Sequence, residues 1–229
     1  MIHQSISRLT KQNTCSTIQK MNLKKLKQAE EEFFNRYLGG FANPEMIAIR
    51  KKHKLDKMIQ LAQDSFAKRN FRLPDLIVEN MIKVITRSSL VSVFEKPRFR
   101  DFARSLPSEE KQILAHGLEE LLHGNEQLGF ETMLEILKSG RLAKWSLMTI
   151  GQAYYRPQVE VFVKPTTVKG IIEYLELRNL HYKPAPTWAF YNEYRAAINE
   201  MKTKVDASLS PYNVAFSGFL MRSIQERYY

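Results

Sequence analysis

The chain has 229 residues, of which 44% are hydrophobic, and its formal net charge at pH 7 is +11. This length is enough for a sizeable core in one domain or two, and no run of about 18 apolar residues is present, so we expect no membrane insertion. The single cysteine, Cys15, excludes an internal disulfide and a thiolate metal cluster, which favours a reducing, cytoplasmic compartment.

Three amphipathic helices are predicted before residue 90. A disordered tail, 1–21, is expected to precede them, and Met21 is a candidate start of the folded part. Gly39-Gly40 stops the first helix, and Pro44 suits the first turn of the second. Residues 88–94 are compatible with either a strand or a continuation of the third helix. The three helices are 22–38, 44 to about 69, and 73–87.

The second half is predicted to be helical apart from one strand. Pro97 and Pro107 bracket a short basic helix, and Ser108 is expected to cap the helix that ends before Gly124. Residues 158–163 form the one convincing strand. Further helices are expected at 132–139, 142–155, 167–179, 187–206 and 211–227. The sequence therefore predicts an all-α fold, a compact bundle-like domain of about nine helices with at most one or two short strands.

The positive charge is confined to the first half of the chain. Residues 1–100 carry 20 Lys and Arg against 9 Asp and Glu, whereas residues 101–229 carry 15 of each kind. We expect a basic helical half, 22–96, and a neutral, aromatic-rich half, 97–229, or else a single domain over 22–229. Such asymmetry is typical of contact with an anionic partner, with nucleic acid ranked before a membrane surface, although solubility alone also explains it.

Apolar spacing also predicts which side chains are buried. Leu23 and Leu76 are expected to be among the apolar contacts of their helices. Tyr191, Tyr194 and Ile198 recur at three and four residues, which favours packing in the core over stacking on nucleic-acid bases.

The densest basic cluster is RKKHKLDK, at residues 50–57, where neighbouring lysines repel one another unless an anion lies between them. A second candidate is VFVKPTTVKG, at residues 161–170, where Pro165 ends a strand and Thr166 or Thr167 caps a helix. The free amides at such a helix start favour an anion. The predicted phosphate contacts are Arg50, Lys51, Lys52, Lys54, Lys57, Lys68, Arg69, Arg98, Arg100, Lys164, Thr166, Thr167 and Lys169.

Metal and cofactor sites are not predicted. His116, Glu120 and His123 share one face of a helix, but that face lies opposite the leucine stripe and is expected to be solvated. A metal site needs a drier, better supported pocket, so these three remain weak candidates. The motifs of dinucleotide binding, phosphate loops and nucleophilic serines are absent, so we expect no cofactor and do not favour an enzyme.

The segment LKSGRLAKWSLMTIGQAYYRPQVEVFVKPTTVKG, at residues 137–170, resembles the core of helix-hairpin-helix DNA glycosylases and related endonucleases. The resemblance implies an all-helical plan and binding of duplex DNA through backbone amides of the hairpin. Lys164 stands near the place of that family's catalytic aspartate, so the resemblance does not extend to its chemistry. The comparable positions are Gly140, Lys144, Ser146, Arg156-Pro157, Val163, Thr166 and Val168-Lys169.

The leading functional prediction is non-catalytic binding of nucleic acid, DNA or RNA, through the basic helices. One alternative is a protein-interaction module that docks an acidic protein or a second copy of itself. A second alternative is an enzyme of unknown reaction, for which His181 with Glu173 and Glu176 is one candidate group.

Overall fold

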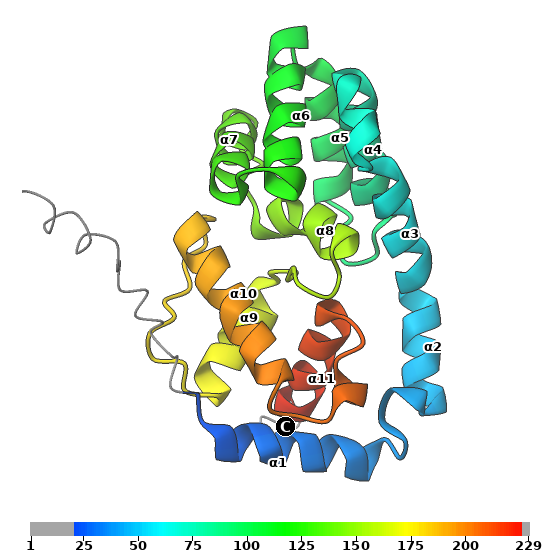
Figure 1. Cartoon of the computed structure of the whole chain (residues 1–229), viewed down its shortest axis with the longest axis vertical. Helices are drawn as coiled ribbons and strands as arrows, with labels where there is room; N and C mark the ends of the chain where they lie inside the picture. The colour runs from blue at the N-terminus through cyan, green and yellow to red at the C-terminus, as the bar shows by residue number, and fades with distance from the viewer. Residues whose placement is uncertain (1–20, 226–229) are drawn as a thin grey trace, which may run out of the picture.

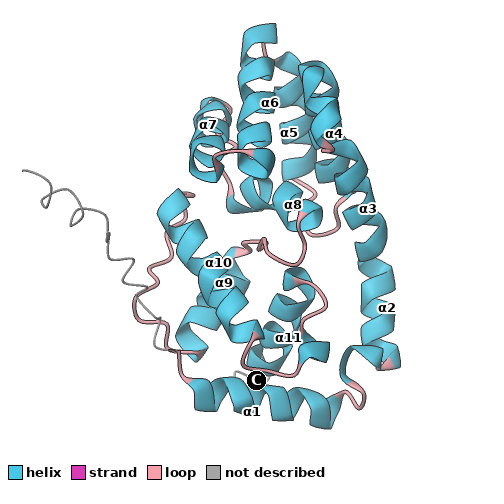
Figure 2. Cartoon of the chain, in the orientation of Figure 1, coloured by secondary structure: helices cyan, strands magenta, loops and turns pink. Residues whose placement is uncertain are grey.

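The computed structural model describes residues 21–225, and this part of the chain is helical throughout its regular structure (Figures 1 and 2). It contains no strand within these residues, so the predicted all-α fold is confirmed. The predicted tail 1–21 lies outside the described residues except for Met21. The α-helices are α1 (Leu23–Arg36), α2 (Pro44–His53), α3 (Leu55–Ser65), α4 (Pro74–Arg87), α5 (Glu95–Ser105), α6 (Ser108–His123), α7 (Glu126–Ser139), α8 (Trp145–Tyr155), α9 (Pro165–Tyr174), α10 (Trp188–Lys202) and α11 (Asn213–Gln225).

The helices form two packed regions that share one continuous core. At one end α4, α5, α6, α7 and α8 pack together with α3, and at the other end α1 lies across α11, with α9 and α10 beside it (Figure 1). Helix α2 runs along one edge and buries only Met46, so it has little contact with either region. Helix α2 thereby forms one wall of the site described below.

The core contains most of the side chains that apolar spacing predicted. Tyr191, Tyr194 and Ile198 are fully buried, which confirms their packing role. Leu76 is 41% exposed, so its predicted burial is wrong, and Leu23, a candidate apolar contact, is 48% exposed. Both lie in the first turn of their helices.

The predicted helix from residue 44 to about 69 is broken in the middle. Lys54 has φ 50° and ψ 36°, which is a left-handed conformation, and its amide bonds to the carbonyls of Arg50 and Lys51 to end α2. Helix α3 then restarts at Leu55, whose side chain is buried. The lysines at 51, 54 and 57 therefore do not lie at regular spacing on one helix, as the unbroken helix required.

The predicted strand at 158–163 is wrong, because residues 158 and 159 lie in a turn and residues 160–163 have no partner strand among the described residues. Side chains replace the partner: Asn199 and Asn213 donate to the carbonyl of Val159 at 2.8 and 2.9 Å, and Thr149 accepts from the amide of Val163 at 3.1 Å. Side chains from α8, α10 and α11 thus satisfy much of its backbone.

Three local predictions also differ from the structure. Residues 88–94 are a loop, because the Ser88 hydroxyl bonds to the amide of Leu90 and to the hydroxyl of Tyr154 and so ends α4. Ser108 does not cap its helix, and neither Thr166 nor Thr167 caps the helix in which both lie. In each case the helix begins earlier than predicted, and the capping positions are Pro107 and Lys164.

Candidate anion-binding surfaces

Six of the predicted phosphate contacts are exposed cations that lie on α2, at the break after it, on α3 and at the start of the short 3-10 helix Lys68–Arg72. None of them has a carboxylate partner within ion-pairing distance in the described part of the chain. Helices α2 and α3 succeed one another along one long edge of the molecule (Figure 1). We call this set the basic edge. Its members are Lys51, Lys52, Lys54, Lys57, Lys68 and Arg69.

The three carboxylates of α2 and α3 are already engaged. Asp56 accepts from both Nε and Nη2 of Arg50, at 3.1 and 2.6 Å, and Asp64 accepts from a glutamine of its own helix. Glu45 lies 3.7 Å from the guanidinium of Arg222. Because Asp56 holds Arg50, this predicted phosphate contact is largely neutralised, unlike the six cations of the basic edge.

A cleft opens between α2 and α11, and the start of α9 closes one side of it. Its volume is about 410 Å³. Aliphatic, thioether and aromatic side chains form most of its wall, and no carboxylate belongs to that wall among the described residues. We call it the α2–α11 cleft. Its apolar wall includes Phe41, Met46, Ile49, Phe162, Val214 and Met221.

Three cationic side chains and one histidine line this cleft, and they differ in their partners. Arg50 is paired with Asp56, and Arg222 donates to the hydroxyl of Tyr37 at 2.9 Å and lies near Glu45. Lys164 has no carboxylate partner in the described ranges, and His53 meets only a serine hydroxyl, at 2.9 Å. Lys164 and His53 are therefore the groups best able to receive an anion.

The charges around His53 affect its protonation. Partial burial lowers the pKa of His53 below its ordinary value of 6.5, and the nearby cations Lys52, Lys164 and Arg222 lower it further. Since these three come from α2, from the start of α9 and from α11, the cleft gathers positive charge from distant parts of the sequence.

Of the four predicted phosphate contacts at the start of α9, two line the cleft and two lie outside it. Lys164 and Thr167 line the cleft, where the first-turn amides have no acceptor within the helix. Thr166 is exposed, and the ammonium of Lys169 lies 5.4 Å from the ring centre of Tyr182, outside the cleft wall. One half of this predicted site therefore approaches α2, while the other half does not.

Arg98 and Arg100 lie apart from these groups, on α5. Arg100 borders a shallow groove between α4 and α5, together with Lys83, Arg87 and Arg104. Arg104 is tied to Glu79 by two bonds of 3.0 Å, and Arg100 pairs with its neighbour in sequence, Asp101. The groove thus has less available positive charge than the basic edge.

The weak metal candidates do not form a ligand set. Nε2 of His123 lies 2.9 Å from the carbonyl of Phe66, and the ring packs edge-on against Phe71 and Tyr155, so its predicted solvation is wrong. Glu120 accepts from a backbone amide in the turn after α6, and His116 is exposed. Within the described ranges, no group of three or more His, Cys, Asp or Glu side chains has metal-binding geometry.

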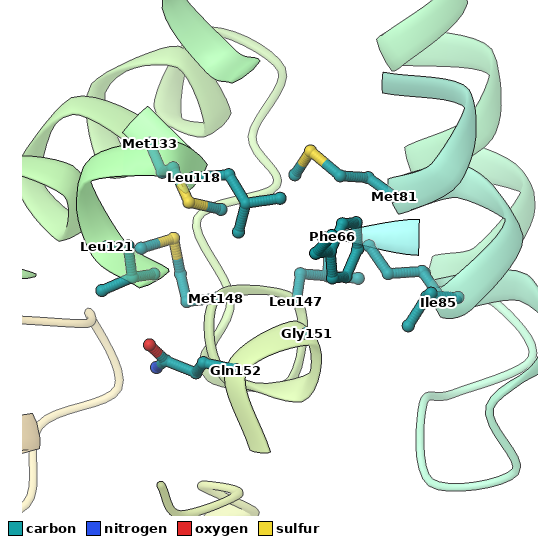
Figure 3. Close-up of a pocket in the computed structure, with 11 residues that line it drawn as sticks. Phe66, Met81, Ile85, Leu118, Leu121, Met133, Leu147, Met148, Gly151 and Gln152 are labelled. Carbon is teal, nitrogen blue, oxygen red and sulfur yellow. The ribbon is translucent and has the colours of Figure 1, made fainter. Parts of the chain in front are cut away.

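A second cavity lies inside the packed region, between α4, α6 and α8 (Figure 3). Its volume is about 10 Å³, which is about the space of one water molecule. Its wall is apolar except for Gln152, whose side-chain amide is buried without a hydrogen-bond partner in the described structure. This cavity is too small for a ligand and belongs to the packing of the core.

A buried ion-pair network joins α7, α8 and α10. Glu160 is fully buried and accepts from the hydroxyl of Tyr191 at 2.6 Å and from Arg195 at 3.0 Å. Arg156 lies 2.6 Å from the same carboxylate, and Glu126 pairs with both arginines. Because each charge has an opposite partner, we interpret this network as structural.

Sequence reasoning did not single out the cleft as a site. The pattern identified Arg50, Lys164 and Thr167, but it gave no role to His53 or Arg222. The sequence carries little signal for this cleft, because the lining residues come from segments about 170 positions apart and only the packing of the chain brings them together.

No described helix has the length and apolar character that a bilayer crossing requires. Searches against protein-family models, curated proteins and solved structures each found no match for this chain. The resemblance of residues 137–170 to helix-hairpin-helix proteins therefore stays a prediction.

Proposed function

We propose that this protein binds the phosphate backbone of nucleic acid through the basic edge, as a binding protein rather than a catalyst. The observation that carries the proposal is the set of six exposed cations without carboxylate partners on consecutive elements, with the carboxylates of α2 and α3 bonded to other side chains. Unpaired cations on one edge can each exchange their counterions for a phosphate, and this release of ions drives binding.

The length of the edge supports a polymeric partner. Helices α2 and α3 together span 21 residues, 10 and 11 respectively, which corresponds to roughly 30 Å of helix. A single small anion needs one or two of these cations, whereas a nucleic-acid strand presents a phosphate at regular intervals along such a length. The side chains offer charge but no arrangement that selects bases, so we expect little sequence preference.

Salt dependence gives the test. With six phosphate contacts, the affinity for a duplex should fall roughly a thousandfold between about 50 and 200 mM salt. Fluorescence anisotropy with labelled DNA and RNA duplexes and single strands measures this slope. Little change in affinity with salt, or no binding at low salt, contradicts the proposal.

A matched pair of variants locates the surface. Replacing Lys51, Lys54 and Lys57 with Gln should weaken binding and lower the slope of log affinity against log salt by about 3. The control replaces three exposed cations near α9 and α10, Arg178, Lys183 and Lys204, and changes the net charge equally. Equal losses in both variants would mean that only net charge matters, and the surface would then be wrong.

Docking of an acidic protein is the competing outcome of the same series. In that case the nucleic-acid probes do not bind at low salt, while the variant at Lys51, Lys54 and Lys57 loses a protein partner that the control variant retains.

A further inference from the structure

The α2–α11 cleft has the composition of a ligand site rather than of a packing defect. Its volume of about 410 Å³ falls within the range of small-molecule pockets, roughly 300–1,000 Å³. Its wall is mostly apolar, and its polar groups are few, which is also typical of such pockets. Met46 and Met221 contribute flexible, polarisable side chains that adapt to varied apolar ligands.

A buried hydroxyl in the cleft wall lacks a partner. Ser217 on α11 is only 7% exposed, and its Oγ makes no hydrogen bond of acceptable geometry within the described structure. It lies close enough to the hydroxyl of Tyr194 to oppose the effect of burial on the pKa of that tyrosine, yet the two do not form a well-directed bond. Because this Oγ is not accessible from the cleft, the pair of hydroxyls belongs to the packing of α10 against α11, and the ligand contacts fall to the groups that face the space.

The charge of the cleft specifies the sign of the ligand. Lys164 and His53 face the space without a carboxylate partner among the described residues, and the first turn of α9 adds the positive end of a helix. Arg50 and Arg222 line the same cleft, and their carboxylate partners, Asp56 and Glu45, are not part of the wall. The cations next to His53 lower its pKa, and an anion between them would relieve that repulsion.

We propose that the α2–α11 cleft binds a small amphipathic anion, with a single carboxylate or phosphate head at Lys164 and His53 and an aliphatic body against the apolar wall. This site goes beyond the proposed nucleic-acid function, because none of its cationic wall residues belongs to the basic edge. A phosphate backbone suits the exposed edge, whereas the mostly apolar wall of the cleft favours a ligand with its own apolar surface.

Calorimetric titration of the full chain with four probes tests the chemistry of the ligand. Dodecanoate and dodecyl phosphate carry the required head and chain, dodecyltrimethylammonium carries the chain with the opposite charge, and acetate carries the head alone. We expect one molecule of either anionic amphiphile to bind per chain, and the tighter of the two identifies the head. We expect no binding of the other two probes. Equal binding of the cationic amphiphile, or absence of binding by both anions, overturns the proposal.

Gly218 offers a way to fill the cleft without touching the core. A Cβ placed at Gly218 would have no atom within 4 Å, and the residue lies on α11 in the cleft wall. Gly218→Leu should therefore keep the fold and weaken dodecanoate binding at least about tenfold. The control is Ala196→Leu, at an exposed position on α10, which should leave the affinity unchanged. Unchanged affinity in Gly218→Leu means that the ligand binds elsewhere, and the proposal fails.

The head of the ligand has its own pair of variants. Lys164→Gln should weaken dodecanoate roughly tenfold, because one charge-assisted hydrogen bond is lost, while Lys183→Gln should have no effect. The triple variant at Lys51, Lys54 and Lys57 should bind dodecanoate as the wild type does, even though it loses nucleic acid. The two proposals therefore fail separately, and displacement of dodecanoate by an oligonucleotide would contradict the separate site.

Discussion

The contact between α6 and α7 and the space between α2 and α11 represent two opposite ways of placing helices side by side. At the first, the backbones approach so closely that a Cβ on Gly129 would overlap the amide of Leu121 and lie 2.5 Å from the carbonyl of Gly117. At the second, a Cβ on Gly218 would meet nothing. The packed region holds a cavity of about 10 Å³, and the other a cleft of about 410 Å³.

This difference separates the residues that maintain the fold from those available for binding. In the network beside the packed region, the ionic groups pair with one another, as Glu160 does with Arg156 and Arg195. Around the cleft and along the basic edge, cations such as Lys164 and Lys57 have no such partner among the described residues. Burial and pairing thus indicate where changes affect stability, and exposure without a partner indicates where they affect binding.

The largest loss of stability is expected from breaking the buried network. Glu160→Ala leaves Arg195 and Arg156 without their buried partner, which should lower the free energy of unfolding by about 3–5 kcal/mol in urea denaturation. Glu193→Ala removes an exposed carboxylate from the same helix as Arg195 and should change stability by less than about 0.5 kcal/mol. Similar values for the two variants would contradict a structural role for the network.

The next effect tests the close contact of α6 and α7. Gly129→Ala should lower the free energy of unfolding by about 3 kcal/mol or more, because the added methyl group meets backbone atoms that cannot rotate away. Urea denaturation monitored by circular dichroism measures the loss. A neutral result would show that the two helices do not lie this close.

The same substitution, glycine to alanine, should have the opposite effect on stability when it is made in the cleft. Gly218→Ala is expected to stabilise the protein by about 0.5–1 kcal/mol, because alanine favours helix and the added methyl group occupies empty space. The changes in the free energy of unfolding of Gly129→Ala and Gly218→Ala thus directly compare the packing around α7 with that around α11. Destabilisation of both variants by a similar amount would mean that α11 is packed as tightly as α7.

The smallest effect concerns the charge of the cleft. The pKa of His53 is lowered in the fold by burial and by Lys52, Lys164 and Arg222. The unfolded chain therefore binds a proton at His53 more readily than the folded chain does. The contribution of His53 to the free energy of unfolding is complete above pH 6.5 and is lost as the pH falls toward the lowered pKa. Because solvent screens this partly exposed site, the loss should be a few tenths of a kcal/mol.

Comparison with His53→Gln isolates this contribution, because the carboxylates titrate alike in both proteins. The stability of the wild type relative to His53→Gln should decrease between pH 7 and pH 5. A constant difference, or an increase toward low pH, would mean that the cleft does not repel a proton at this position.

Periodic spacing predicted the existence of most helices and the burial of residues such as Tyr191, since both follow from local sequence. It could not predict the break at Lys54. There, the burial of Leu55 and the hydrogen bonds that end α2 outweigh the preference of lysine for a right-handed conformation. It also mistook residues 158–163 for a strand, because the pattern fits an extended chain but does not reveal what pairs with it.

The candidate sites show the same limit. The basic edge was largely predictable, because its cations are close together in sequence and their exposure follows from their charge. The cleft was not, because Arg222 and Met46 are far apart in the sequence and share one wall only in the folded chain. A lysine such as Lys164 gives no sequence signal that separates a phosphate contact from one wall of an apolar cleft.

Lysine acetylation measured by mass spectrometry tests most directly the claim that unpaired cations on one edge bind nucleic acid. At low salt, added nucleic acid should slow the acetylation of Lys51, Lys52, Lys54 and Lys57, while the rates at Lys183 and Lys204 stay unchanged. Equal protection at all exposed lysines, or protection at Lys183 and Lys204 without protection on α2 and α3, would contradict the account.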